Sequence, residues 1–264
     1  DQLLQRLGAS QSDRLASLEN QAELVEQRDD LSITFAELYS QTGQPEMALD
    51  ILSNHQFHAW EGGEGGAAGQ YALAQVVKGL SALDAGKLEQ ALTHFLAAQK
   101  PPDNLGVGRG MSMYDVLAWF NTAETITALG DAENAKDYYQ KVIDAEKRFS
   151  RWGGASALTY YAAISLQALG QKSDADQKLS ALREFAQQKL EAGSEANFFT
   201  SKPSMVVFDD DPQLANQIQG HYLMGLTLLG LGQTGQAQDS FKSVLQLDPH
   251  HWWANYQLKR VPNM

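Results

Sequence analysis

Two glutamates follow a tryptophan in the segment Trp60-Glu-Gly-Gly-Glu, an arrangement of residue types that could do chemistry. Glycosidases use paired carboxylates, one as acid and one as base or nucleophile, and an adjacent aromatic ring is a platform for sugar. Glu61 and Glu64 can also be read as a helix cap and a solvated or Arg-paired carboxylate. The second interpretation is the plainer one. We therefore predict no catalytic residue here and keep Trp60, Glu61 and Glu64 as candidate ligand- or partner-binding residues.

Metal chemistry has two weak candidates. His55 and His58 stand three apart near the same glutamates, but no third ligand accompanies them. Asp209 to Asp211 is an acidic run without the alternating spacing of a calcium loop, and Asp211-Pro212 is typical of a helix cap and first turn. The chain has no cysteine, which excludes disulfides, thiolate nucleophiles and cysteine metal sites. We predict no bound metal.

A glycine-rich stretch, Gly106-Val-Gly-Arg-Gly110, has the look of a phosphate loop. It follows a helix and Pro101-Pro102, not a strand, and lacks the Gly-Lys-Ser/Thr ending. We therefore expect no nucleotide and no other cofactor. Arg109 and Arg151 are candidate binders of anions or carboxylates, although each could instead tie its loop to an acidic neighbour.

Composition narrows the possible partners. The 264 residues include 43% apolar and 20% charged side chains, as in a folded globular protein, and carry a net charge of −12. That charge repels phosphate backbones and anionic lipid, so we expect neither nucleic acid nor membrane as a partner. No signal peptide is visible, which slightly favours the cytoplasm, but the compartment stays open. Because the chain begins with Asp1, we expect a fragment or processed form of a longer protein.

A repeated pattern organises the chain: a helical run ends in Gly, and a second helical run has Ala five residues and a bulky residue nine residues after that Gly. The five copies are Gly43/Ala48/Leu52, Gly86/Ala91/Phe95, Gly130/Ala135/Tyr139, Gly170/Ala175/Leu179 and Gly232/Ala237/Phe241. The Gly suits a left-handed helix end, and the Ala allows the second helix to cross the first closely. Upstream, residues 13–27 carry a one-sided apolar stripe that predicts a leading helix.

This pattern resembles the tetratricopeptide repeat (TPR). The last copy is closest, because Gly225, Leu228, Gly232, Ala237, Phe241 and Pro249 stand at the family's spacings. The resemblance implies an all-α fold, a right-handed TPR-like superhelix (α-solenoid) of about five helix pairs, continuous over residues 1–264. A trailing helix follows Pro249.

The linkers between the helix pairs are long for a repeat of about 34 residues. They span residues 55–66, 100–110, 148–154 and 197–211, and equivalent linkers of a stacked solenoid lie along one edge. Unlike flexible linkers, they contain aromatic residues, namely Phe57, Trp60, Phe149, Trp152, Phe198, Phe199 and Phe208. These rings either tuck beneath their loops as small satellite cores or line a pocket with carboxylates and arginines.

A narrower resemblance concerns these linkers. Residues 60–66, the turn at 104–108, and Phe199-Thr-Ser-x-Pro with residues 207–211 look like those in the C-terminal TPR region of large bacterial proteins that carry an uncharacterised, β-rich domain of unknown function. That resemblance implies an association with carbohydrate and supplies no residue roles.

Together these features predict a non-catalytic interaction scaffold that binds a protein partner or a neighbouring domain of its parent chain. The alternative is a carbohydrate-binding accessory module that holds an oligosaccharide at the aromatic linker edge. The candidate binding residues for either are Trp60, Glu61, Glu64, Asn104, Arg109, Arg151, Trp152, Phe199 and Asp209.

Overall fold

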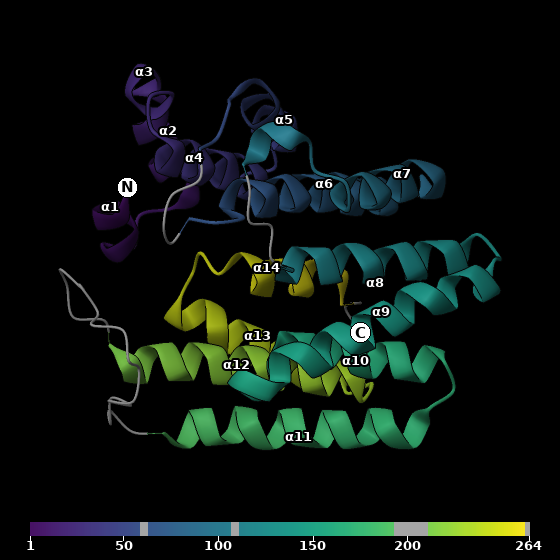
Figure 1. Ribbon diagram of the computed structural model, residues 1–264. Coiled ribbons are helices and arrows are strands. Elements are labelled where there is room, and N and C mark those ends of the chain that lie inside the picture. The colour runs from purple at the N-terminus through teal and green to yellow at the C-terminus, as the bar shows by residue number, and fades with distance from the viewer. Residues whose placement is uncertain (59–62, 107–110, 193–210, 262–264) are drawn as a thin grey trace. The chain divides into compact units, whose positions relative to one another are not determined.

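The computed structural model describes residues 1–58, 63–106, 111–192 and 211–261 (Figure 1). Throughout these ranges the regular structure is helical, which confirms the all-α prediction. The chain forms two compact units, Asp1–Ala145 and Glu146–Met264, and the boundary between them falls within one helix. The continuous single domain expected from the sequence stays a prediction.

Consecutive helices form five pairs within the described residues, as the repeat predicts. The pairs are α4 (Asp29–Gln41) with α5 (Pro45–Asn54), α6 (Gly66–Asp84) with α7 (Leu88–Ala98), α8 (Met113–Ala128) with α9 (Ala132–Gly153), α10 (Ala157–Ala168) with α11 (Lys172–Glu191), and α12 (Pro212–Gly230) with α13 (Thr234–Leu247). Three short helices precede them, α1 (Gln2–Arg6), α2 (Gln11–Glu19) and α3 (Ala22–Val25), and α14 (Trp252–Arg260) follows. A 3₁₀ turn, η1 (Asp103–Leu105), lies between α7 and α8.

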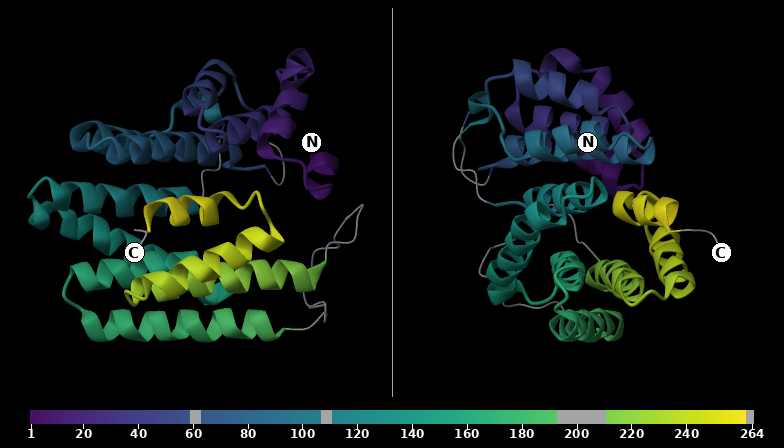
Figure 2. Two further views of the ribbon diagram at one scale, coloured as in Figure 1. Left: turned by 180° about the vertical axis from the view of Figure 1, so that it is seen from behind. Right: turned by 90° about the vertical axis from the view of Figure 1, so that its right-hand side faces the viewer.

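Neighbouring helices pack in chain order inside each unit. In the first unit α4 packs on α5 and α6, and α6 packs on α7 and α8. In the second, α10, α11, α12 and α13 each pack on the next, and α14 packs on α13 (Figure 2). This succession of adjacent antiparallel helices is the architecture of a helical repeat array.

Each of the five repeat glycines ends its helix in the same way. All five have a positive φ, from +71° at Gly86 to +90° at Gly130. At the first of them, the amide of Gln44 donates to the carbonyl of Tyr39 at 2.8 Å and that of Gly43 to the carbonyl of Ser40 at 3.3 Å. The same two hydrogen bonds recur at the other four, and they define the Schellman motif, in which a left-handed residue closes the helix.

Every pair has a small buried residue in its first helix and a large buried residue in its second, and the two are in contact at Gly79–Phe95 and Gly225–Phe241. The small residues, seven positions before the turn glycine, are Ala36, Gly79, Ala123, Ala163 and Gly225, and the large ones are Leu52, Phe95, Tyr139, Leu179 and Phe241. All ten are buried. The predicted alanines, Ala48, Ala91, Ala135, Ala175 and Ala237, are fully buried as well, with an exposed fraction of 0%.

Two sequence expectations about helix limits are wrong. The predicted linker at 148–154 is helical up to residue 153, because nothing in Arg-Phe-Ser-Arg-Trp breaks a helix and α9 ends only at the glycines. Gly154, with a φ of +72°, then turns the chain. The leading helix expected over residues 13–27 is instead divided into α2 and α3, although its stripe residues Leu15, Leu18 and Val25 are buried.

Candidate functional site

The first linker is attached to the start of α4 by Asp29. One carboxylate oxygen of Asp29 lies 2.6 Å from Nε2 of His55, and the other accepts the backbone N–H of His58 at 2.7 Å. The His58 ring is also near, with Nδ1 at 3.4 Å. Burial alone would raise the pKa of Asp29, but the hydrogen bonds from His55 and His58 outweigh it and lower the pKa. The sequence does not predict this role of Asp29 in holding the first linker.

Asn104 joins the second linker to the first. Its side-chain amide donates to the main-chain carbonyls of Leu52 at 2.8 Å and His55 at 2.7 Å. The main-chain carbonyl of Asn104 accepts the N–H of Phe57 at 2.9 Å. These bonds satisfy carbonyl groups at the end of α5 that have no partner within the helix. The first two linkers therefore lie side by side, as expected for a stacked array.

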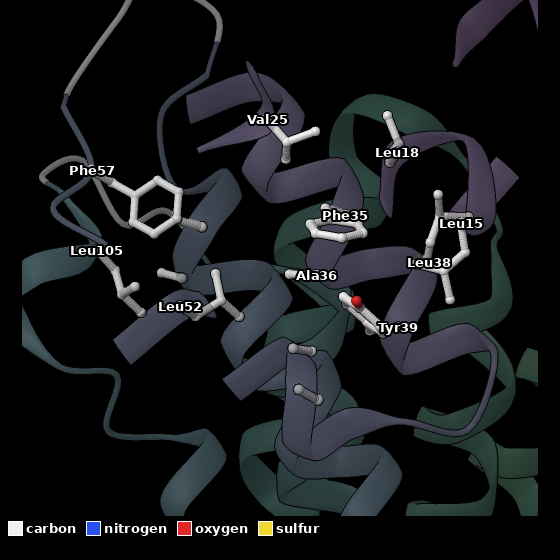
Figure 3. Close-up of a cluster of buried hydrophobic side chains, with 14 residues drawn as sticks. Leu15, Leu18, Val25, Phe35, Ala36, Leu38, Tyr39, Leu52, Phe57 and Leu105 are labelled. Atoms are coloured by element: carbon white, nitrogen blue, oxygen red, sulfur yellow. The ribbon is translucent and has the colours of Figure 1, made fainter. Parts of the chain in front are cut away.

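The aromatic residues of the linkers differ in their surroundings. Phe57 has an exposed fraction of 3% and belongs to the core of the first unit together with Leu52 and Leu105 (Figure 3). Its ring also lies edge-on to that of His55, with centroids 4.5 Å apart. Phe149, on α9, is 37% exposed. The satellite-core interpretation therefore applies to Phe57 and not to Phe149.

The other candidate residues divide into exposed side chains and residues outside the described ranges. Glu64 is exposed just before Gly65, the N-cap of α6, and Arg151 is exposed in the last turn of α9. Trp60, Glu61, Arg109, Phe199 and Asp209 lie outside the described residues, as does the side chain of Trp152. Their binding roles stay predictions.

Asp211, the last residue of the acidic run before α12, has a structural role. Asp211 is the N-cap of α12, and one carboxylate oxygen accepts the backbone N–H groups of Gln213 at 2.9 Å and Leu214 at 3.1 Å. Pro212 occupies the first helical position, as the sequence predicts. Among the residues with described positions, no three His, Asp or Glu side chains are grouped so that they could hold a metal ion.

Comparison with known families agrees with the helix pairs. Residues 218–251, which run from within α12 through α13, match the tetratricopeptide repeat, and residues 117–146, in α8 and α9, match it again. The chain contains TPR repeats. No solved structure matches it.

The two matched segments contain the turn and the residue pair that recur along the chain. The first match contains the turn Gly232 and the Gly225–Phe241 contact, and the second contains Gly130 and the Ala123–Tyr139 pair. The other three pairs share the same turn hydrogen bonds and have buried small and large residues at the same positions. No helix within the described part of this chain is both long and apolar enough to cross a membrane.

Proposed function

We propose that this protein is a non-catalytic interaction scaffold whose first end binds a protein partner or a neighbouring domain of its parent chain. TPR proteins generally mediate protein–protein interaction, which supports the proposal at the level of its class. The observation that carries it further is the exposure of apolar side chains before the first helix pair. Leu3, Leu7 and Leu24 have exposed fractions of 56%, 73% and 51%.

The helices that carry these leucines contribute little to the core. α1 has no buried residue, and α3 buries only Val25. By contrast, the last helix, α14, buries Ala254 and Gln257. Exposed leucines on the segments that precede the first helix pair favour a partner that covers them.

Crosslinking of wild-type and variant chains to proteins of a cell extract tests this proposal. In L3D/L7D, a charge on each exposed leucine should abolish capture of the partner that wild-type protein crosslinks. The matched control is L129D/L231D, which places the same charges at two other leucines, 39% and 41% exposed, and should capture the partner normally. Equal capture by both double variants would contradict a partner surface at the first end.

A second candidate function is oligosaccharide binding at the linker edge. The hydrogen bond between Phe57 and Asn104 supports it, because it holds the aromatic-containing first linker against the second linker. Tryptophan fluorescence titrated with a panel of oligosaccharides tests this candidate. We expect a saturable change that Trp60→Ala or Trp152→Ala abolishes and that Trp252→Ala, on α14, leaves in place. No change with any sugar would exclude it.

A further inference from the structure

A cleft of about 340 Å³ lies between the first and second helix pairs, within the first unit. Gly43, Pro45 and Glu46 form one wall, from the turn before α5 and its start. Lys78, Ser81 and Ala82 of α6 and its C-cap Ala85 also line the cleft, as do Lys87, the N-cap of α7, and Gln90 and His94 of α7.

The cleft lies where the second repeat differs in side-chain size from the other repeats. Four residues before each turn glycine, the repeats have Tyr39, Ala82, Ile126, Leu166 and Leu228. The second repeat alone has a small residue there, and that residue, Ala82, lines the cleft. At the position one helical turn earlier, the five repeats have Phe35, Lys78, Thr122, Ala162 and Met224. The second repeat therefore has only a methyl group where the other four have a large apolar side chain, and a cation one turn before it.

The cation is the less exposed partner of its ion pair. The ammonium of Lys78 lies 3.2 Å from Oε1 of Glu46, and the side-chain exposed fractions are 23% for Lys78 and 66% for Glu46. A partly desolvated ammonium interacts more strongly with an anion than a fully solvated one. Because Glu46 is the exposed partner, it can rotate to solvent and leave Lys78 to another anion.

His94 adds a second nitrogen donor. Its Nδ1 lies 2.9 Å from Oε1 of Gln75, and Nε2 of Gln75 donates to the hydroxyl of Tyr71 at 3.3 Å. This arrangement assigns the proton to Nδ1 and leaves Nε2 as the nitrogen that can gain one. Burial and the nearby Lys78 lower the pKa of His94, whereas Glu46 raises it, so the ring takes up a proton more readily once an anion is present.

We propose that this cleft is a binding site for the oxyanion, carboxylate or phosphate, of a small ligand, with Lys78 and His94 as its main contacts and Lys87 at its rim. In a chain of net charge −12, this cleft is lined by two lysines and a histidine and by only one carboxylate, Glu46, so its local charge is of the opposite sign. The ligand's oxyanion replaces Glu46 on Lys78 and takes a hydrogen bond from protonated His94 Nε2. The proposal is independent of the partner surface at α1.

Titration of the purified chain with inorganic phosphate, succinate or chloride at equal ionic strength tests the site, with the His94 imidazole followed by NMR. We expect a saturable shift with phosphate or succinate and none with chloride, and tighter binding at pH below the usual histidine pKa of about 6.5. The anion that saturates identifies the ligand class. Absence of saturation with both anions would overturn the proposal.

Two variants locate the binding. Lys78→Met removes the charge, and Ala82→Leu fills the cleft with a side chain that other repeats have at that position; each should weaken binding by about tenfold or more. Lys136→Met is the matched control, because Lys136 pairs with Glu133 at an exposed position of α9, and it should bind as wild type. Unchanged affinity in A82L, which retains every charge, would show that the anion binds elsewhere.

Discussion

The α-carbon of Gly225 lies against the ring of Phe241, so closely that a methyl group at Gly225 would come within 2.5 Å of Phe241 Cε1. The second repeat has the same contact, between Gly79 and Phe95, at 2.3 Å. In the first and fourth repeats the large residue is leucine, and its partner is alanine. Glycine thus occurs in the two repeats whose large residue is phenylalanine, and at these two contacts the packing leaves no room for a methyl group, whereas the third repeat has Ala123 with Tyr139.

Gly225→Ala should lower the free energy of unfolding by about 1–3 kcal/mol, the usual cost of forcing an extra methyl into a packed core. Gly235→Ala is the matched control, since Gly235 is also helical and a methyl there meets no atom within 4 Å. It should raise stability by about 0.4–1 kcal/mol. Urea denaturation followed by circular dichroism measures both.

The double variant G225A/F241L, which restores the Ala–Leu pairing, should be more stable than G225A. If the double variant recovers no stability, the argument from side-chain size is wrong.

The turn glycines are constrained by backbone conformation, not by space. A methyl group at Gly170, which has a φ of +76°, would meet nothing within 4 Å. Gly170→Ala should therefore destabilise the chain only through the left-handed conformation, by about 1–2 kcal/mol. Gly170→Asn should cost less, because asparagine tolerates that conformation better. Thermal unfolding of the two variants gives the comparison, and an equal loss in both would contradict this account.

The C-terminal helix should be sensitive to acid through His251. Nδ1 of His251 accepts the backbone N–H of Ala254 at 3.1 Å and so caps α14 only when that nitrogen has no proton. Burial lowers the pKa of His251, while Asp248 raises it. The unfolded chain then takes up the proton first, so stability should fall as the pH drops through about 6.5 toward the lower folded value.

The variant His251→Asn separates capping from titration. Asparagine is a good N-cap that does not titrate, so H251N should keep its stability at neutral pH and lose less of it in acid than wild type. H251A should be less stable at neutral pH by about 1 kcal/mol, because it lacks the cap. Denaturation curves across the acid range measure the free energy of unfolding of each variant. Equal losses of stability in wild type and H251N would show that a group other than His251 causes the acid sensitivity.

Asn104 should control the order of the first linker. Asn104→Ala leaves the carbonyls of Leu52 and His55 without their donor, which should cost about 1–3 kcal/mol. Hydrogen exchange should show lost protection of the Phe57 amide, which is bonded to the main chain of residue 104. Asn54→Ala removes an exposed hydrogen bond to Asp50 at the end of α5 and serves as control. Retained protection in N104A would mean that the linkers stay together without this side chain.

Local signals in the sequence determined the repeat. The turn glycines, the crossing alanines and the large residues that follow them are fixed by helix geometry within one repeat, so their spacing predicted five helix pairs correctly. The same spacing predicts the small first-helix residue when all repeats are aligned on the turn glycine. The Asp211 cap was equally readable, because a cap depends on the next three residues only.

Contacts between distant residues were decided by the tertiary structure. The hydrogen bonds from His55 and His58 to Asp29, and from Asn104 to the end of α5, join positions in different repeats or linkers, and no local pattern encodes such a pairing. The repeat pattern predicts a linker at residues 148–154, whereas α9 continues to Gly153. One feature of the cleft at Lys78 and Ala82 is visible in the sequence, because Ala82 is small where the other four repeats have a large residue. Its walls exist only once the helices pack, because burial and cleft shape depend on which neighbours surround each side chain.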